Sequence, residues 1–421
     1  MRLVHSYSPF EEICFLFGDD QKPVEMSVWR KDDLQTGSLH IARAVRSVGS
    51  GWFLDAGNGR SAYMNNPSFH LKPDGTLCHD KLTQGDSLIV RIIRPQTMEK
   101  EAEATHKVSL AGQYVVLLPT QKTPMFSRRL DQTSMERLKL LAPNEGVLFR
   151  TAACGADLNK VAADIEMLKK QWQELLSGRD WQPSVLYRPI RDVFRYANLY
   201  RDELSGIVTD DSETASLLKK EGFSVSFNMQ GVWKAEHLDE ALDSIGNVRS
   251  ELPSGGFLMT QQTAACVCFD VNAGSGLISA ANEEACPEIL RQIRSKGLGG
   301  QMIVDFAGRK DEKITRRLIQ KLKNENVFIS GISTLGLVEM TVEKTRCSFF
   351  DLFSAERRSV RVAADIVRRL WFSCITGTVV IQAPADVCGL VRPYVRLMQD
   401  RLKTAVKLEP AEIVRMEGIK E

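Results

Sequence analysis

The feature that most constrains this 421-residue chain is a pair of aspartates, each at the end of an apolar run. Asp270 lies in AACVCFDVNAG (264–274), and Asp305 lies in GGQMIVDFAG (299–308). The stretch EEACPEILRQIRSKG (283–297) between them is typical of a helix, with proline near its start and glycine past its end. Strand, helix and strand in this order predict a right-handed βαβ unit, in which the two strands are parallel neighbours.

This arrangement brings two carboxylates together at one edge of a sheet. Neighbouring strands lie about 4.8 Å apart, so both side chains could bind one hard cation. Ligands of open α/β sheets usually bind at this edge, and metal-dependent phosphodiester hydrolysis needs such a site. The alternative is that each aspartate only caps its strand.

Composition limits the class of protein. A chain of 421 residues with 43% hydrophobic content predicts roughly three domains with packed cores. The net charge of +2 excludes a polycation. Residues 309–323 are nevertheless rich in Lys and Arg, with Asp311 and Glu312 as the only acids. A basic helix close to Asp305 suits a polyanionic substrate, although a solvated helix face explains the charges equally well.

The cysteines and histidines favour a reducing compartment. Nine cysteines show no framework spacing and no CxxC pair, and six histidines form no zinc signature. The N-terminus contains Glu11, Glu12, Asp19 and Asp20 without a signal-peptide core, and no apolar run approaches 18 residues. We expect a cytoplasmic protein without a membrane span.

The first third of the chain has the pattern of short strands. Strands are expected at Glu12–Phe17 and Val24–Trp29, and from Gly37 onward short strands with Gly-rich turns suit a five-stranded OB barrel. Phe53 and Tyr63 fall on successive strands of this barrel. They could stack bases, or they could be barrel core or ordinary surface residues, of which core is the more frequent role.

A second group of candidates follows the barrel. Residues 108–119 (VSLAGQYVVLLP) predict one strand, and GVLFRTAACG (146–155) predicts another that ends at Arg150 and Thr151. A guanidinium and a hydroxyl side by side could bind a terminal phosphate. The amphipathic stretch Leu158–Leu176 predicts a packing helix.

The remaining regions alternate between strand and helix patterns. This holds for residues 184–248, and the turn LPSGG (252–256) separates them from the unit with the two aspartates. A helix at Ser359–Phe372 and strands at 376–384 and 406–410 predict a small α/β region at the end.

Five stretches, taken together and in order, resemble the ribonuclease E/G family over nearly the whole chain. They are SLAGQYVVLLP, GVLFRTAACG, LPSGGFLMTQQTAACVCFDVNAG, GLGGQMIVDF and ISTLGLVEMTVEKTR. The last stretch is closer to the ribonuclease G branch.

The resemblance implies a multidomain α/β fold with five parts. An RNase H-like subdomain (1–36 and 186–248) is interrupted by an OB-type RNA-binding barrel (37–107) and a 5′-sensor region (108–185). A DNase I-like catalytic subdomain (249–350) and a small C-terminal domain (351–421) follow.

The resemblance also implies roles for individual residues. Asp270 and Asp305 match the aspartates that hold Mg²⁺, and Asn272 matches the asparagine that supports them. The RNA-binding positions of the barrel match Phe53, Tyr63 and Lys100, and the positions of the 5′-monophosphate pocket match Gly112, Val116, Arg150 and Thr151.

The chain also departs from the family pattern. The CPxC-type zinc link that pairs subunits is replaced by RCSFFDLFSAERR (346–358), in which Cys347 is the only cysteine, which argues against structural zinc. The segment between the aspartates is shorter, and Gly308 replaces an acid. Val342 and Glu343 stand before Lys344 where the family commonly has basic residues.

These implications predict a Mg²⁺-dependent endoribonuclease that cuts single-stranded RNA and leaves 5′-phosphate and 3′-hydroxyl ends, in RNA processing or decay. A preference for 5′-monophosphorylated RNA and a homodimer without a zinc link are further expectations. The departures leave one alternative open, which is a non-catalytic RNA-binding protein that keeps this fold.

Overall fold

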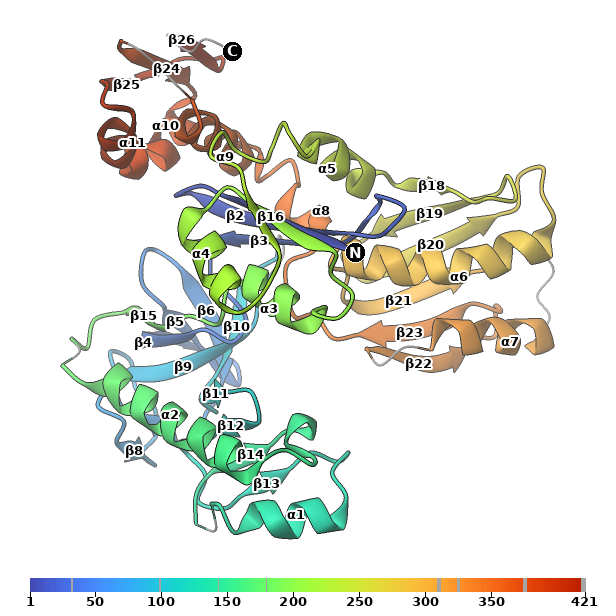
Figure 1. Ribbon diagram of the computed structural model, residues 1–421. Helices are drawn as coiled ribbons and strands as arrows, with labels where there is room; N and C mark the ends of the chain where they lie inside the picture. The colour runs from blue at the N-terminus through green and yellow to red at the C-terminus, as the bar shows by residue number, and fades with distance from the viewer. Residues whose placement is uncertain are drawn as a thin grey trace. The chain divides into compact units, whose positions relative to one another are not determined.

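The chain folds into two units, one formed by residues 32–189 and the other by residues 1–31 together with 190–421. The computed structural model describes residues 1–31, 33–97, 100–142, 144–178, 180–308, 312–323, 326–373 and 377–417. The fold is mixed α/β with a closed five-stranded barrel (Figure 1). No helix in the described ranges has the length and apolarity needed to cross a bilayer.

The barrel belongs to the unit of residues 32–189. Its ring consists of β4 (Leu39–Val48), β5 (Gly51–Asp55), β6 (Ser61–Asn65), β10 (Ala102–Thr105) and β9 (Ser87–Arg94). Parallel pairing of β10 with β6 and antiparallel pairing of β4 with β9 close the ring. Alternate residues point inward and form a core of small and branched side chains, among them Ala42, Ala44, Leu54, Ala62, Leu88 and Val90.

Shorter elements complete this unit. β15 (Ser184–Tyr187) extends the barrel sheet beside β4, and the hairpin β7 (His70–Leu71) and β8 (Leu77–Cys78) pairs with β9. A second sheet has the order β11-β12-β14-β13 and packs against α2. Its strands and neighbouring helices are β11 (Leu110–Ala111), β12 (Val115–Leu117), β13 (Met125–Phe126), β14 (Val147–Phe149), α1 (Gln132–Lys139) and α2 (Leu158–Leu176).

The expectation of one strand over 108–119 is wrong. β11 and β12 are antiparallel to each other and meet at a turn that begins at Gly112. The carboxylate of Asp164 on α2 accepts hydrogen bonds from the backbone N–H groups of Gln113, Tyr114 and Val115. A Cβ at Gly112 would lie 2.5 Å from Asp164 Oδ1, so only glycine fits there. A contact with a distant helix therefore creates the turn.

A five-stranded sheet of the other unit joins residues from both ends of its sequence. Its order is β17-β16-β1-β2-β3, in which β1 pairs in parallel with β16. Helices α3 and α4 pack on one face and α5 on the other. The elements are β1 (Arg2–Tyr7), β2 (Glu11–Phe17), β3 (Pro23–Arg30), α3 (Asp192–Leu199), β16 (Gly206–Thr209), α4 (Ser212–Lys220), β17 (Val225–Phe227) and α5 (Leu238–Gly246).

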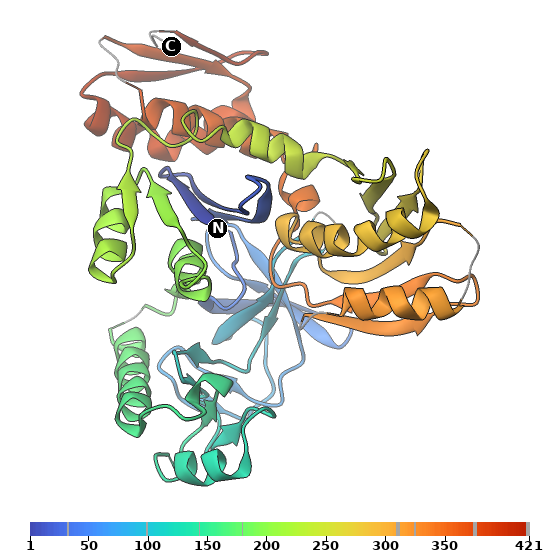
Figure 2. The same cartoon turned by 45° about the vertical axis from the view of Figure 1, so that its right-hand side comes forward.

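The candidate site lies on a six-stranded sheet with the order β18-β19-β20-β21-β23-β22. Its strands are β18 (Arg249–Glu251), β19 (Phe257–Gln262), β20 (Val267–Asn272), β21 (Gly300–Asp305), β22 (Val327–Ile332) and β23 (Val338–Val342). Helices α6 (Ile278–Ser295) and α7 (Glu312–Leu322) share one apolar core with the sheet and cover the same face of it (Figures 1 and 2). The opposite face carries the residues that alternate with this core, among them both Asp270 and Phe257.

The helix between the aspartates begins earlier than expected. α6 starts at Ile278, so Pro287 lies inside the helix rather than near its start. Proline removes one backbone hydrogen bond from a helix. The buried face of α6, with Ala281, Ala285 and Ile289 in the core, provides the tertiary packing that holds it.

The C-terminal part is a three-stranded sheet, β25-β24-β26, packed against helices. The expected helix and both expected strands are confirmed. The elements are α8 (Phe349–Leu352), α9 (Arg358–Trp371), β24 (Val379–Ala383), α10 (Ala385–Val391), the 3₁₀ turn Arg392–Tyr394, α11 (Val395–Leu402), β25 (Val406–Pro410) and β26 (Arg415–Glu417). Phe10, from the connection between β1 and β2, is part of its core.

Candidate functional site

The expected parallel pairing of the two aspartate strands is confirmed. β20 and β21 are parallel neighbours, and Asp270 stands directly opposite Asp305 in the register. Strands in such a pair lie about 4.8 Å apart. The crossover helix α6 packs on the face that carries Phe269 and Val304, so the aspartates alternate to the other face.

Asn272 positions the first aspartate. It lies two residues after Asp270 on β20, so both side chains are on the same face. Its amide Nδ2 donates a hydrogen bond to Asp270 Oδ2 at 2.9 Å. The side chain of Asp270 is exposed, and in the described part of the chain this amide is its one hydrogen-bond partner, with no Lys or Arg within 4 Å. The carboxylate is therefore oriented, and no cation among the described residues neutralises it.

The donor set fits a magnesium ion. Mg²⁺ takes oxygen ligands, keeps several waters and is usually bound by one or two carboxylates. Asp270 and Asp305 supply two carboxylates at adjacent strand ends. No group of three or more His, Cys, Asp or Glu side chains arranged for a metal occurs among the described residues. A site with two carboxylates would thus leave most of the coordination shell to water and substrate.

Three basic residues of the neighbouring helix, Arg316, Arg317 and Lys321, do not support an anion site beside Asp305. Arg316 pairs with Glu312, while Arg317 and Lys321 both pair with Glu283 on α6. These cations lie on a helix that covers the other face of the sheet. A solvated helix face therefore explains these three positive charges better than an anion site does. Arg309, Lys310 and Asp311 lie outside the described residues.

Gly308 is required by the local backbone. Its φ is +87°, in the left-handed region, and a Cβ there would lie 2.9 Å from Ile278 Cγ2 at the start of α6. An acid at this position would need Ile278 to move. The glycine at 308 and the start of α6 at Ile278 therefore pack against each other.

Sequence reasoning missed an acid on the same open face. Glu339 lies on β23 opposite Ile303, the residue two positions before Asp305. Its side chain is exposed, whereas Val338 and Met340 on either side of it are buried in the core. The alternation in VEMTV (338–342) is the signal that could have placed Glu339 on this face.

The barrel aromatics lie side by side on the outside of the barrel. Phe53 on β5 is directly opposite Tyr63 on β6, and their rings pack edge to face with centroids 5.6 Å apart. Both are half-buried, while Trp52, Leu54 and Met64 fill the core instead. The guanidinium of Arg46 lies 4.8 Å from the Phe53 ring centroid. The core interpretation of these aromatics is therefore wrong.

Lys100 lies in the connection between β9 and β10. Its backbone N–H donates to Thr97 Oγ1 at 3.2 Å. Within the described residues its ammonium group makes no hydrogen bond, ion pair or cation–π contact. The Lys100 side chain is therefore exposed, and in the described residues it contacts neither Phe53 nor Tyr63 through a polar or ring interaction.

The residues expected around a terminal phosphate gather at the β11–β12 turn. Arg150 donates a hydrogen bond to the carbonyl oxygen of Gly112 at 2.6 Å, and its own backbone N–H donates to Tyr114 O. Thr151 begins the 3₁₀ turn Thr151–Ala153, and its hydroxyl bonds to the hydroxyl of Ser127 at 2.9 Å. Val116 is half-buried on β12, opposite Ala111 and Leu148. Arg150 and Thr151 are both exposed.

The segment in place of the zinc link is held by internal contacts. Arg346 pairs with Glu25 at 3.0 Å and donates to Tyr196 Oη and Arg294 O. Ser348 caps α8 through a reciprocal pair of hydrogen bonds with Asp351, and Lys344 pairs with the same carboxylate at 3.0 Å. Lys344 is therefore committed to a structural ion pair.

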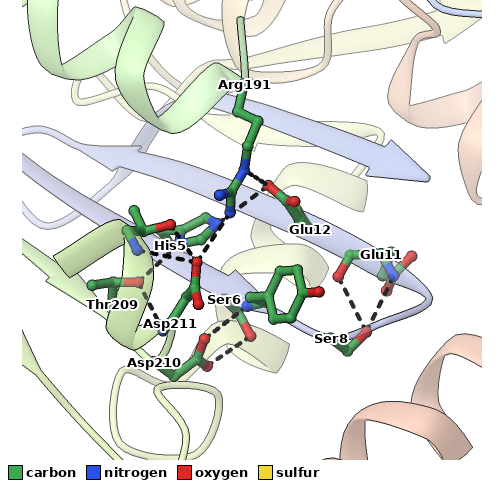
Figure 3. Close-up of polar contacts among 11 residues, drawn as sticks. His5, Ser6, Ser8, Glu11, Glu12, Arg191, Thr209, Asp210 and Asp211 are labelled. Atoms are coloured by element: carbon green, nitrogen blue, oxygen red, sulfur yellow. Dashed lines mark hydrogen bonds and ion pairs between the residues drawn. The ribbon is translucent and has the colours of Figure 1, made fainter. Parts of the chain in front are cut away.

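A second group of acids lies where β1 and β16 end (Figure 3). Asp210 accepts hydrogen bonds from Ser6 Oγ and from the backbone N–H groups of Tyr7 and Val232. Arg191 pairs with both Glu12 and Asp211 (Figure 3). The buried His5 bonds through Nδ1 to Thr209 Oγ1 at 2.8 Å.

The pKa values in this group differ in direction. Burial raises the pKa of Asp210, although its hydrogen-bond donors oppose the change. Burial would also raise the pKa of Asp211, but the Thr214 hydroxyl and Arg191 outweigh it and hold that pKa below its usual value. Both carboxylates already have protein donors, so this group does not offer a vacant metal site.

Known proteins resemble the chain over most of its length. The sequence profile of the ribonuclease E/G family matches residues 109–345, more than half of the chain. Ribonuclease E of Nostoc sp. is 28% identical across 95% of this chain and 64% of its own length. Ribonuclease G of Escherichia coli is 28% identical across 62% of this chain and 60% of its own length.

The chain thus spans less than two thirds of the length of these two relatives. The family match covers the β11–β12 turn with Arg150 and Thr151, the paired strands with Asp270, Asn272 and Asp305, and the stretch that ends at Thr345. The chain therefore belongs to the ribonuclease E/G family.

Proposed function

We propose that this protein is a Mg²⁺-dependent endoribonuclease that cleaves single-stranded RNA and leaves 5′-phosphate and 3′-hydroxyl ends. The observation that carries the proposal is the pairing of Asp270 with Asp305 on parallel neighbouring strands, with Asn272 bonded to the first of them. The sheet of residues 249–350 with α6 and α7 is then a DNase I-like catalytic subdomain, and the sheet of β1–β3, β16 and β17 is RNase H-like.

Each residue of the site has a separate task. Asp270 and Asp305 hold the ion through carboxylate oxygens, and Asn272 fixes the orientation of Asp270. When bound, Mg²⁺ polarises the scissile phosphate and lowers the pKa of a water molecule. The exposed face around Asp270 leaves room for an RNA backbone.

The barrel binds the unpaired strand. Phe53 and Tyr63 offer ring surface on the outside of an OB-type barrel, and Lys100 adds an exposed positive charge. Base stacking on an aromatic side chain contributes about 1–3 kcal/mol per base and does not require a particular sequence. Because paired bases are not available for such stacking, the barrel favours single strands.

The β11–β12 turn recognises the 5′ end. Arg150 and Thr151 present a guanidinium and a hydroxyl beside the Gly112 backbone, with Val116 next to them. A 5′-monophosphate can accept hydrogen bonds from both groups, whereas a 5′-hydroxyl offers no anion. Arg150→Gln should reduce the rate advantage of 5′-monophosphorylated over 5′-hydroxyl RNA. Equal wild-type rates on both substrates would rule out this role.

The direct test of catalysis replaces one ion ligand and compares it with a matched acid. Asp305→Asn keeps the size of the side chain but removes its charge, and should abolish cleavage of a single-stranded oligonucleotide in Mg²⁺. Glu343→Gln removes one charge after β23, at the end of the sheet opposite Asp305, and should leave cleavage unchanged.

The same assay tests the non-catalytic alternative. Wild-type protein should cleave labelled RNA in Mg²⁺ and stop when EDTA is added. RNA that is bound but remains intact in Mg²⁺ would establish an RNA-binding protein without turnover. Equal cleavage by Asp305→Asn and wild type would contradict the assignment of the metal site to Asp305.

Assembly is a separate part of the proposal. A cytoplasmic homodimer without a zinc link is consistent with the internal use of the segment around Cys347. Light scattering across concentrations, with and without a chelator, should give the same dimeric mass. Dissociation by the chelator would show that a metal joins the subunits.

A further inference from the structure

The barrel has a pocket that is lined in part by Phe53. It has a volume of about 490 Å³, and all of its lining residues belong to the unit of residues 32–189. Ligand pockets typically measure about 300–1,000 Å³, a range that accommodates one nucleotide. Phe53 lines the pocket and also forms the edge-to-face pair with Tyr63, so the pocket continues the surface proposed for base stacking.

One wall of the pocket is built by a segment distant in sequence. Arg43 on β4 donates a hydrogen bond to Gln182 Oε1 at 2.9 Å, across 139 residues. Gly57 approaches Pro183 so closely that a Cβ would lie 2.7 Å from its carbonyl oxygen. Ser87 on β9 donates to Trp181 O. These contacts fix the wall in place before any ligand binds.

The pocket combines cationic, amide and apolar groups. Arg43 has no carboxylate within 4 Å in the described part of the chain, and Arg60 has Asp33 at 3.7 Å. Among the lining residues are also Asn58 and Gln182, whose amides can bond to the edge of a base. The apolar side chains of Val45 and Pro183 can contact the flat face of a base.

The acid in the pocket is held by the backbone. Asp55 lies opposite Arg43 in the β4–β5 register, but its Oδ1 accepts a hydrogen bond from the N–H of Gly57 at 2.9 Å. No ion pair joins Asp55 to Arg43 within the described residues. The guanidinium therefore keeps its positive charge for a ligand.

We propose that this pocket is a nucleotide subsite for single-stranded RNA, which binds the nucleotide next to the one stacked on Phe53 and Tyr63. Arg43 and Arg60 contact its phosphate, and the amides of Asn58 and Gln182 contact its base. This inference rests on the proposed RNA binding by the barrel and adds a second binding position to it.

The test measures binding of a fluorescent single-stranded hexanucleotide by the full chain in EDTA, where cleavage does not occur. The double variant Arg43→Gln, Arg60→Gln should bind at least about tenfold more weakly, since two charge-assisted contacts are lost. The slope of log affinity against log salt should fall by about 0.7, the value for one phosphate contact to a single strand. Circular dichroism should show an unchanged fold.

Two control variants distinguish the loss of positive charge in the pocket from a change in its wall. Arg94→Gln removes an arginine on the same barrel that is paired with Glu103 and lies outside the pocket, so affinity and salt slope should not change. Gln182→Ala removes the partner of Arg43 but keeps the guanidinium. It should weaken binding less than the double variant and leave the salt slope as in wild type.

The outcomes distinguish this inference from the proposed function. If Phe53→Ala weakens binding and the double arginine variant does not, the subsite is wrong while RNA binding by the barrel stands. If Phe53→Ala and Tyr63→Ala also bind as wild type, the barrel is not the RNA-binding surface. A free mononucleotide that competes as well as the hexanucleotide would assign the pocket to a free nucleotide instead of a strand.

Discussion

Two groups of acidic residues in the unit of residues 1–31 and 190–421 differ in how their charges are compensated. Asp270 is exposed, and in the described residues it has one amide donor and no cation. Glu12, Asp210 and Asp211 are buried or half-buried, and each has an arginine or several N–H and O–H donors (Figure 3). The carboxylate of Asp270 can accept a metal ion, whereas the second group already has its partners within the protein.

The difference distinguishes acids that can bind a ligand from acids whose charge is already used in the fold. An acid paired with a cation, as Asp211 is with Arg191, has a lowered pKa and contributes to stability, whereas burial of Asp210 outweighs its donors and raises its pKa. An oriented acid without a cationic partner contributes little to stability and keeps its charge for a ligand. The site near Asp270 should therefore affect rate, and the network near Arg191 should affect stability.

The largest effect is expected at the site. Asp270→Asn should lower the rate of RNA cleavage by at least about 100-fold, because a metal contributes several kcal/mol of charge stabilisation in the transition state. Since the side chain is exposed, the free energy of unfolding should change by less than about 0.5 kcal/mol. Single-turnover cleavage and urea unfolding measure both. A stable variant with wild-type cleavage would contradict the distinction.

The network around Arg191 should show the opposite pattern, which is a large effect on stability and none on the cleavage rate. Arg191→Met leaves Glu12 buried and Asp211 half-buried without their shared cation, and should cost about 2–4 kcal/mol of stability. Cleavage per folded molecule should remain as in wild type. Urea unfolding and an assay normalised to folded protein test this. Unchanged stability would mean that these ion pairs contribute nothing to the fold.

A smaller effect on rate is expected from the residue that orients Asp270. Asn272→Ala removes its hydrogen bond and should lower cleavage about 10- to 100-fold, the usual cost of losing a group that supports a metal ligand. The Mg²⁺ concentration needed for half-maximal cleavage should rise. If the rate falls while the Mg²⁺ dependence stays the same, Asn272 acts on the RNA and not on the ion ligand.

The smallest effect concerns pH. The pKa of Asp211 lies below its usual value of 3.8 in the folded state, so its contribution to stability is present above that pH and is lost as the pH falls. Asp210 has a raised pKa, so its contribution has the opposite sign and is lost as the pH rises above 3.8. Asp211→Asn keeps the helix cap and should flatten the loss of stability below about pH 4. Asp210→Asn should remove the loss of stability that occurs as the pH rises above about 4, and urea midpoints between about pH 2.5 and 7 compare the two.

Local patterns predicted the elements that depend on local sequence. The helix Leu158–Leu176 follows from its apolar period, and the structure adds Asp157, whose side chain caps its first turn. The pairing of Asp270 with Asp305 follows from two short apolar runs joined by one helix, because few topologies can connect them.

Long-range contacts explain what the sequence did not predict. The break at Gly112 depends on Asp164, and the pocket wall depends on Arg43 and Gln182, which are 139 residues apart. The network of Figure 3 joins His5 to Thr209 across 204 residues. No local period carries such information, so Arg43 and Arg191 could be placed only from the structure, whereas the alternation in 338–342 could have placed Glu339.

The most direct test of the paired-acid site measures ion binding without RNA. Mn²⁺ binds oxygen ligands as Mg²⁺ does, and electron paramagnetic resonance counts the free ion. Wild-type protein should bind Mn²⁺, Asp270→Asn and Asp305→Asn should each bind it at least tenfold more weakly, and Asp211→Asn should bind it as wild type. Equal Mn²⁺ affinity in all four proteins would contradict the assignment of the ion to Asp270 and Asp305.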